Sequence, residues 1–220
     1  MGGLDLSMIP PEDEPPSAYD INRKEQYAAL GRFVEAFEAL VNEARDGCIE
    51  IIIGNDDTKA YLAEIAFHHQ AMTAKPLFEI LQAMIAEIIK DPSAPEFAER
   101  EAFGQVLKQI NKEYMDLANK RNNLLHGTWF IGYTSPDDPD SKTFQIRKFT
   151  TSQDGLKKLE LPTEAAELDA LTVRCIAARD WLSLLCACLG GSKALFSIRE
   201  RFYHSDGRSR VLIATPLVRV

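Results

Sequence analysis

The spacing of apolar positions predicts long amphipathic helices over most of the chain. The first helix is expected from about Arg23, because apolar residues then recur every three or four positions. The apolar run 49–53 could extend this helix. A second helical stretch is expected over 59–90, where Pro76 must kink it or split it in two, because proline lacks an amide hydrogen and clashes with the preceding turn.

Two further helices are expected, a third over 96–125 and a last one that begins at Thr163, a good N-cap residue. The apolar positions of the last helix alternate steps of three and four, as in the seam of a helical bundle. The predicted seam consists of Leu168, Leu171, Cys175, Ala178, Leu182, Leu185 and Leu189. Long helices with such seams indicate a mainly all-α fold, an up-and-down bundle of four or five helices.

Residues 128–161 have a different pattern from the helical stretches. Residues 129–133 are aromatic and favour β structure, and 143–149 alternate apolar and polar side chains. The Asp-Gly pair at 154–155 is a turn signal. A small β-hairpin or three-stranded meander is therefore expected as an insertion between the helices.

The chain is expected to fold as one domain with an extension at each end, because 220 residues are enough to bury a core. Residues 1–20 are acidic and rich in proline, so they are predicted to be a flexible extension. Residues 21–191 form the bundle with its β insertion. Residues 192–220 are predicted to be a tail that packs on the bundle, with a short helix and an edge strand in 211–220.

Composition and charge limit the classes of function. No apolar run approaches the ~18 residues that span a bilayer, and the acidic start is unlike a signal peptide. A cytoplasmic protein with no membrane association is therefore expected. The net charge of −8 argues against broad, non-specific nucleic-acid binding, which depends on many lysines and arginines. It leaves room for a nuclease with a small, local basic site.

The cysteines and histidines do not have the spacing of a metal site. No Cys-x-x-Cys pair occurs among the four cysteines, which are Cys48, Cys175, Cys186 and Cys188. All four are predicted to be reduced core residues. The four histidines do not complete a zinc set. The chain also lacks a Glu-x-x-His pair and a phosphate-cradling glycine loop. No metal and no cofactor is therefore expected.

One segment carries candidate chemistry, the run Arg-Asn-Asn-Leu-Leu-His at 121–126, where the third helix ends. A second Arg-x4-His run occurs at 199–204. That copy has Glu200 after the arginine and ends no long helix. The first copy is therefore the candidate site.

The 121–126 segment resembles the signature of the HEPN superfamily, an arginine followed by a small polar residue and, four to six positions after the arginine, a histidine. The helical context extends the resemblance loosely over 23–189. The resemblance implies metal-independent RNA cleavage, in which the 2′-hydroxyl attacks the adjacent phosphate and leaves a 2′,3′-cyclic phosphate. It also implies a homodimer with a composite active site, and the role of a bacterial toxin or phage-defence effector with an antitoxin or another protein partner.

The residue types in the segment suit this chemistry. His126 titrates near neutral pH and can act as general acid or base. Arg121 offers a planar fork of donors to phosphate oxygens. Asn122 lies four residues before His126, on the same helical face, so its amide could orient the imidazole. Lys120 and Asn123 are candidates for contact with phosphate or base.

The alternative is a HEPN-like helical module without catalysis that binds a protein partner or a nucleotide. Arginine and histidine near a helix C-terminus also complement the helix dipole. Arg121 and His126 are separated by roughly 140° around an ideal helix, so one chain aims them apart unless the last turn loosens at Gly127. Glu35, Glu38 and Glu43 of the first helix are interpreted as a solvated face.

Overall fold

The computed structural model describes residues 18–53, 60–69, 72–126, 128–130, 145–152, 155–159, 161, 164–189 and 197–202. Several sequence predictions fall outside these residues. They concern most of the N-terminal extension, Gly127 and the edge strand within 211–220. The prediction of Thr163 as N-cap is wrong, because the N-cap of the last long helix is Glu164, which forms a capping box with Glu167.

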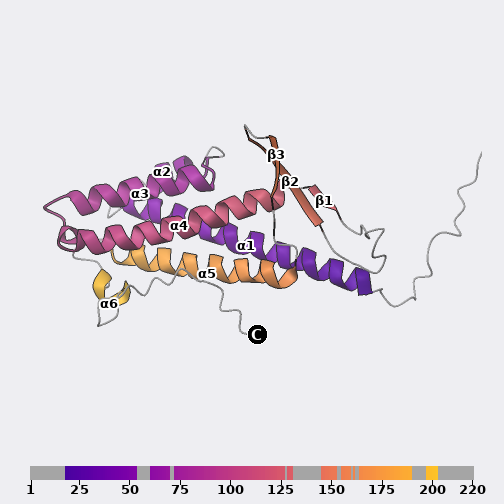
Figure 1. Ribbon diagram of the computed structural model, residues 1–220. Coiled ribbons are helices and arrows are strands. Elements are labelled where there is room, and N and C mark those ends of the chain that lie inside the picture. Colours follow the sequence, from indigo (N-terminus) through magenta and orange to yellow (C-terminus); the bar gives the residue numbers. More distant parts are fainter. Residues whose placement is uncertain are drawn as a thin grey trace, which may run out of the picture.

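Helices make up most of the described chain, so the prediction of a mainly helical fold is confirmed (Figure 1). The helices are α1 (Ala18–Ile53), α2 (Ala60–Phe67), α3 (Ala74–Lys90), the 3-10 helix η3 (Pro95–Glu99), α4 (Arg100–Leu125), α5 (Ala165–Ala187) and α6 (Ile198–Phe202). Three strands follow α4 in the chain, β1 (Thr128–Phe130), β2 (Gln145–Ser152) and β3 (Gly155–Leu159). They form an antiparallel sheet in the order β1-β2-β3, with Trp129 opposite Ile146 and Phe149 opposite Lys158.

The predicted break in the second helical stretch is confirmed. The chain leaves α2 at Phe67 and begins α3 at Ala74, so Pro76 lies in the first turn of α3. The amide groups of the first turn have no hydrogen-bond partner within the helix, so a proline there destabilises the helix little. The predicted third helix is divided instead of continuous, because η3 ends at Glu99 and α4 begins at Arg100.

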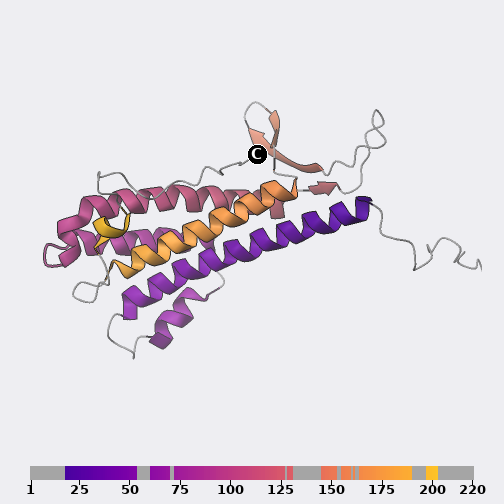
Figure 2. The ribbon, with the colours of Figure 1, turned by 90° about the horizontal axis from the view of Figure 1, so that it is seen from below.

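Helix α1 lies along α5 in both views (Figures 1 and 2), and this is the most extensive contact between two helices in the described part of the chain. Arg32, near the middle of α1, forms a bidentate pair with Asp169, near the start of α5, with both N–O distances at 2.9 Å. Further along both helices, a Cβ added to Gly47 would lie 2.9 Å from Cys186 Sγ. The two helices therefore run in the same direction, and they approach so closely at Gly47 that a side chain would need a shift of its neighbour.

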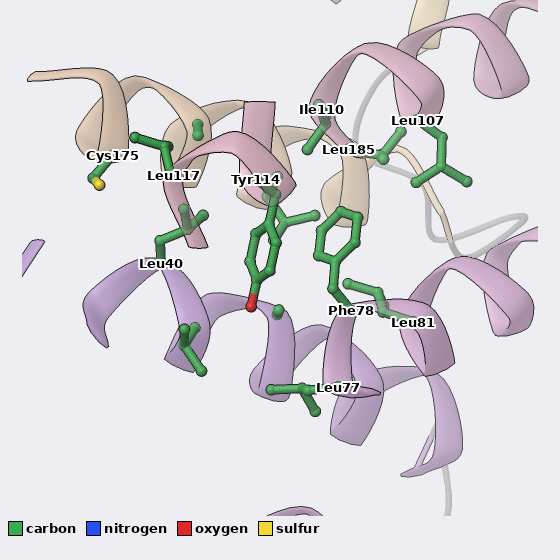
Figure 3. Packing of buried hydrophobic residues seen from close by; sticks show 14 of the residues in the cluster. Leu40, Leu77, Phe78, Leu81, Leu107, Ile110, Tyr114, Leu117, Cys175 and Leu185 are labelled. Carbon is green, nitrogen blue, oxygen red and sulfur yellow. The ribbon is translucent and has the colours of Figure 1, made fainter. Parts of the chain in front are cut away.

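The core lies where α1, α3, α4 and α5 meet, and Tyr114 of α4 stands at its centre (Figure 3). Its ring stacks on Phe78 of α3 at 4.1 Å between centroids and contacts Phe37 of α1 at 6.2 Å. The largest fully buried side chains are Tyr114, Phe33, Phe37, Phe78, Phe103, Phe202, Leu40, Leu77, Leu81, Ile85, Ile110 and Leu117. They come from helices far apart in the sequence, so hydrophobic burial fixes how the helices cross.

The prediction that the cysteines are core residues is confirmed. Cys48, Cys175 and Cys188 are buried, Cys186 packs against the core, and all four are free thiols. Burial raises the pKa of Cys48, Cys175 and Cys186 to about 12 and that of Cys188 to about 11. These thiols therefore stay protonated at neutral pH, and a protonated thiol is a poor nucleophile.

Candidate active site at the end of α4

A cavity of about 420 Å³ lies between α1, the start of α3 and the C-terminal end of α4. Its volume is within the range of small-molecule sites. The lining residues are Phe37, Glu38, Val41, Arg45, Met72, Thr73, Ala74, Lys75, Met115, Ala118, Asn119, Arg121, Asn122 and His126. Three residues of the Arg-x4-His segment are thus among them.

Arg121 and His126 line this cavity together within one chain. The regular helix ends at Leu125, and His126 is the C-cap with φ −100° and ψ 7°; its amide donates to the Asn122 carbonyl at 3.0 Å. An ideal helix would separate Arg121 and His126 by roughly 140°. Because His126 lies just outside the helix, a second chain is not needed to bring it to the cavity of Arg121.

Arg121 makes three contacts, two with α1 and one with its neighbour in α4. Its Nη2 donates to Glu38 Oε1 at 2.9 Å, and its Nη1 donates to Asn122 Oδ1 at 3.3 Å. The guanidinium carbon lies 5.9 Å from the centre of the Phe37 ring, within the range of a cation–π contact. Its Nε is buried and has no hydrogen-bond partner among the described residues. The guanidinium is thus positioned before any ligand binds.

Glu38 was interpreted from the sequence as part of a solvated face, but in the structure it has a defined partner. Its side chain is 49% exposed, but it pairs with Arg121, 83 residues further along the chain, and it lines the cavity. Glu38 is the only carboxylate among the described lining residues. Any anion that approaches Arg121 must therefore compete with it.

The other residues singled out from the sequence have different surroundings. Asn122 lines the cavity, and its amide oxygen accepts from Arg121. His126 is exposed, and within the described part of the chain its imidazole makes no hydrogen bond, so a contact by which Asn122 orients it is not seen. Lys120 and Asn123 do not line the cavity.

Lys120 belongs to a charge cluster on the α5 side of α4. Its Nζ lies 2.9 Å from Asp116 Oδ2, and Arg174 of α5 pairs with both Asp116 and Glu113 at 2.6 Å. Burial would raise the pKa of Asp116, but hydrogen bonds from Arg174 and Lys120 lower it. Asp116 therefore stays ionised and holds Lys120 near α5.

Two cations that the sequence did not single out complete the lining, Arg45 of α1 and Lys75 of α3. Arg45 follows Glu38 by seven residues, which is two helical turns and the same face. A search of that face of α1 for charged residues could have found it. Lys75 has no such signal, because only the packing of α3 on α1 and α4 brings it to the cavity.

Tyr114 fixes the start of α3 at the edge of this cavity. Its hydroxyl donates to the Ala74 carbonyl at 3.0 Å. Burial, together with the negative charge of Glu38, raises the pKa of Tyr114 well above its ordinary value, so the hydroxyl remains a donor. The buried core thus positions Lys75 through the backbone of the preceding residue.

The cavity is basic although the whole chain is acidic. Among the described lining residues, the three cations Arg45, Lys75 and Arg121 face the single carboxylate of Glu38. Within the described ranges, no group of three or more His, Cys, Asp or Glu side chains is arranged to hold a metal ion. None of the described helices is long and apolar enough to span a membrane.

No protein-family model, no curated protein and no solved structure matches the chain. The assignment of function therefore rests on the residues of the cavity.

Proposed function

We propose that the protein is a metal-independent endoribonuclease of HEPN type. The observation that carries the proposal is that Arg121 and His126 line one cavity together with two further cations, Arg45 and Lys75. A cleft of this size with converging cations suits a phosphate ester. Cations set in a pocket and not spread over the surface also fit a chain whose net charge is −8.

In the proposed reaction, a general base removes the proton of the RNA 2′-hydroxyl, and the oxygen attacks the adjacent phosphorus. The bond from phosphorus to the 5′-oxygen breaks, and a general acid protonates the leaving oxygen. The products carry a 2′,3′-cyclic phosphate and a 5′-hydroxyl. His126 serves as one of the two proton-transfer groups, and Arg121 stabilises the charge that builds up on the phosphorane.

In this proposal, the protein is an up-and-down bundle of four or five helices with an inserted β meander. It acts in the cytoplasm on RNA. It is a homodimer in which two Arg-x4-His segments face one cleft, while each chain keeps its own Arg121 and His126 in one cavity. The biological role is that of a toxin or phage-defence effector, with an antitoxin or another protein as regulator.

The test is cleavage of RNA by the purified protein in EDTA, with products analysed by mass spectrometry. Cleavage should persist in EDTA and give cyclic phosphate ends. His126→Ala should slow it by about 10²–10⁴-fold, and Arg121→Lys should also be impaired, because lysine lacks the bidentate fork.

His204→Ala, from the second Arg-x4-His run, is the control and should cleave like wild type. DNA should not be cut, because it has no 2′-hydroxyl. Loss of cleavage in EDTA, or cleavage of DNA as well as RNA, would contradict this mechanism.

A second candidate function is a non-catalytic helical module that binds a protein partner or a nucleotide. The ion pair between Arg121 and Glu38 favours it, because Arg121 then has a structural role without any substrate. Under this function, the wild-type protein cleaves no RNA, and His126→Ala and Arg121→Lys bind the partner as wild type does.

A further inference from the structure

Among the described residues, the groups that accept hydrogen bonds from Arg45 carry no charge. In the described part of the chain, its Nε donates to the Phe67 carbonyl at 3.1 Å and its Nη1 donates to the Asn42 side-chain oxygen. Both acceptors are uncharged. They fix the direction of the guanidinium without neutralising it, which is the arrangement expected of a cation that binds an anion.

Lys75 is a second cation among the residues that line the cavity. Its Nζ lies 3.8 Å from Glu79 Oε1, and both side chains are more than half exposed. An exposed ion pair of this kind is weak in water, so the ammonium group can turn towards an anion. Neither Arg45 nor Lys75 belongs to the Arg-x4-His segment.

The residue of α1 that pairs with Arg121 and the residue Arg45 itself lie two helical turns apart. Arg121 pairs with Glu38, and Arg45 lies seven residues after Glu38 on the same helix. With a rise of 1.5 Å per residue, these two α1 positions are about 10 Å apart along the axis. This distance corresponds to about three stacked nucleotides at 3.4 Å each, and to fewer in an extended strand.

The wall between the two positions suits a nucleotide. Met115 is half-buried at this wall and offers apolar surface to a base, with the buried Phe37 and Val41 behind it. The exposed Asn119 offers an amide to a sugar or base edge. A volume of about 420 Å³ is at the small end of ligand sites. The volume therefore holds one nucleotide, and the phosphates of the strand on either side of it lie towards Arg121 and towards Arg45.

We propose that Arg45 and Lys75 form a second phosphate subsite, which binds a phosphate of the same RNA strand beyond the scissile one. This subsite rests on the proposed function, since Arg121 and His126 define which phosphate is cleaved. It makes the substrate a single strand of at least two phosphates that enters between α1 and the start of α3.

The experiment measures binding of a 2′-O-methyl hexanucleotide, which cannot be cleaved, by fluorescence anisotropy over a range of salt concentrations. Arg45→Gln should weaken binding by about tenfold, as expected for loss of a charged hydrogen bond, and Lys75→Gln by about threefold. Each should also reduce the slope of log affinity against log salt by about 0.7, the value for one phosphate contact in a single strand.

Arg45→Lys keeps the charge and should keep the salt slope. The matched controls are Arg32→Gln on α1 and Lys90→Gln on α3, which lie outside the cavity and should bind like wild type. Lys75 is exposed and serves no buried contact, so Lys75→Gln tests the subsite even if Arg45→Gln loosens α2.

Unchanged affinity and salt slope in both Arg45→Gln and Lys75→Gln would overturn the subsite. Inorganic phosphate and adenosine monophosphate are measured as separate ligands. If either binds as tightly as the hexanucleotide and depends on the same two residues, the site belongs to a free phosphate or nucleotide, and the RNA subsite is wrong. Cleavage is assayed separately, so an inactive protein with the expected binding pattern refutes the ribonuclease and not the subsite.

Discussion

At the scale of single residues, Glu38 has two opposite effects on Arg121. The ion pair holds the guanidinium at the cavity, and the same carboxylate competes with a phosphate for it. The pair is partly exposed, 28% for Arg121 and 49% for Glu38, so its energy is small, about 0–1 kcal/mol. The cation–π contact with Phe37 and the hydrogen bond to Asn122 would keep Arg121 in place without it.

Glu38→Gln should therefore bind non-cleavable RNA about two- to fivefold more tightly than wild type. The unfolding free energy should change by less than about 1 kcal/mol. Glu35→Gln, which removes an exposed carboxylate of α1 outside the cavity, is the control for the change in net charge. Weaker or unchanged RNA binding in Glu38→Gln would show that Arg121 serves the fold and not a phosphate.

The buried thiols predict how stability depends on pH. Their pKa is ordinarily near 9, and burial raises it to about 12 for Cys48. A pKa that is higher in the folded state gives stability that is complete below about pH 9 and is lost as pH rises towards 12. Each such thiol lowers the unfolding free energy by up to about 1.4 kcal/mol per pH unit in this window.

Urea unfolding in a reducing buffer should give a constant free energy between pH 7 and 8 and a steep fall above pH 9. Cys48→Ala should show a shallower fall than wild type, whatever its stability at neutral pH. Equal slopes above pH 9 for the two proteins would mean that the Cys48 thiol is not shielded in the fold.

At the scale of elements, Tyr114 joins α4 to the start of α3. The ring stacks on Phe78, and the hydroxyl donates to the Ala74 carbonyl. Tyr114→Phe keeps the ring and removes one hydrogen bond, so the unfolding free energy should fall by about 1 kcal/mol. The urea midpoint should decrease with no change in the slope of the transition.

Tyr27→Phe is the matched control, because Tyr27 is 47% exposed on α1 and should lose almost nothing. The prediction is wrong if both variants change alike, or if Tyr114→Phe is as stable as wild type.

At the scale of the whole molecule, the proposed dimer can be separated from the proposed site. Light scattering at micromolar concentration should give twice the chain mass, and a specific interface should bury more than ~1,000 Å² in total. Leu125, at the end of α4, is 39% exposed and lies next to His126. A monomer at this concentration would refute the proposed dimer but not the proposed site in the cavity.

Mixing two inactive variants tests whether each chain contains a complete site. Arg121→Gln and His126→Ala, mixed and allowed to exchange subunits, should recover no activity, because both residues line the same cavity of one chain. If each site took its arginine from one chain and its histidine from the other, half of the mixed dimers would contain one intact site. Recovery of about one quarter of wild-type activity would therefore show a composite site.

Most helical stretches and many inward-facing residues could be predicted from the sequence alone. Leu168, Leu171, Cys175 and Leu182 are buried as their spacing predicts. Pro76 marks the division between two helices. These features could be predicted because the pattern of apolar residues within one helix directly reports which side of that helix meets the core. The Arg-x4-His segment was found in the same way, from residues close together in the chain.

The surroundings of that segment depend on how the helices pack and could not be predicted from the sequence. Glu38 meets Arg121 across 83 residues, and Arg45 and Lys75 reach the cavity from two other helices. Lys120 is a neighbour of Arg121 in sequence, but it turns to Asp116 on the α5 side of α4. The reason is geometric. Periodicity fixes the face that a helix buries, whereas the partner of a charged side chain depends on how helices cross, which the packing of distant core residues such as Phe37, Phe78 and Tyr114 sets.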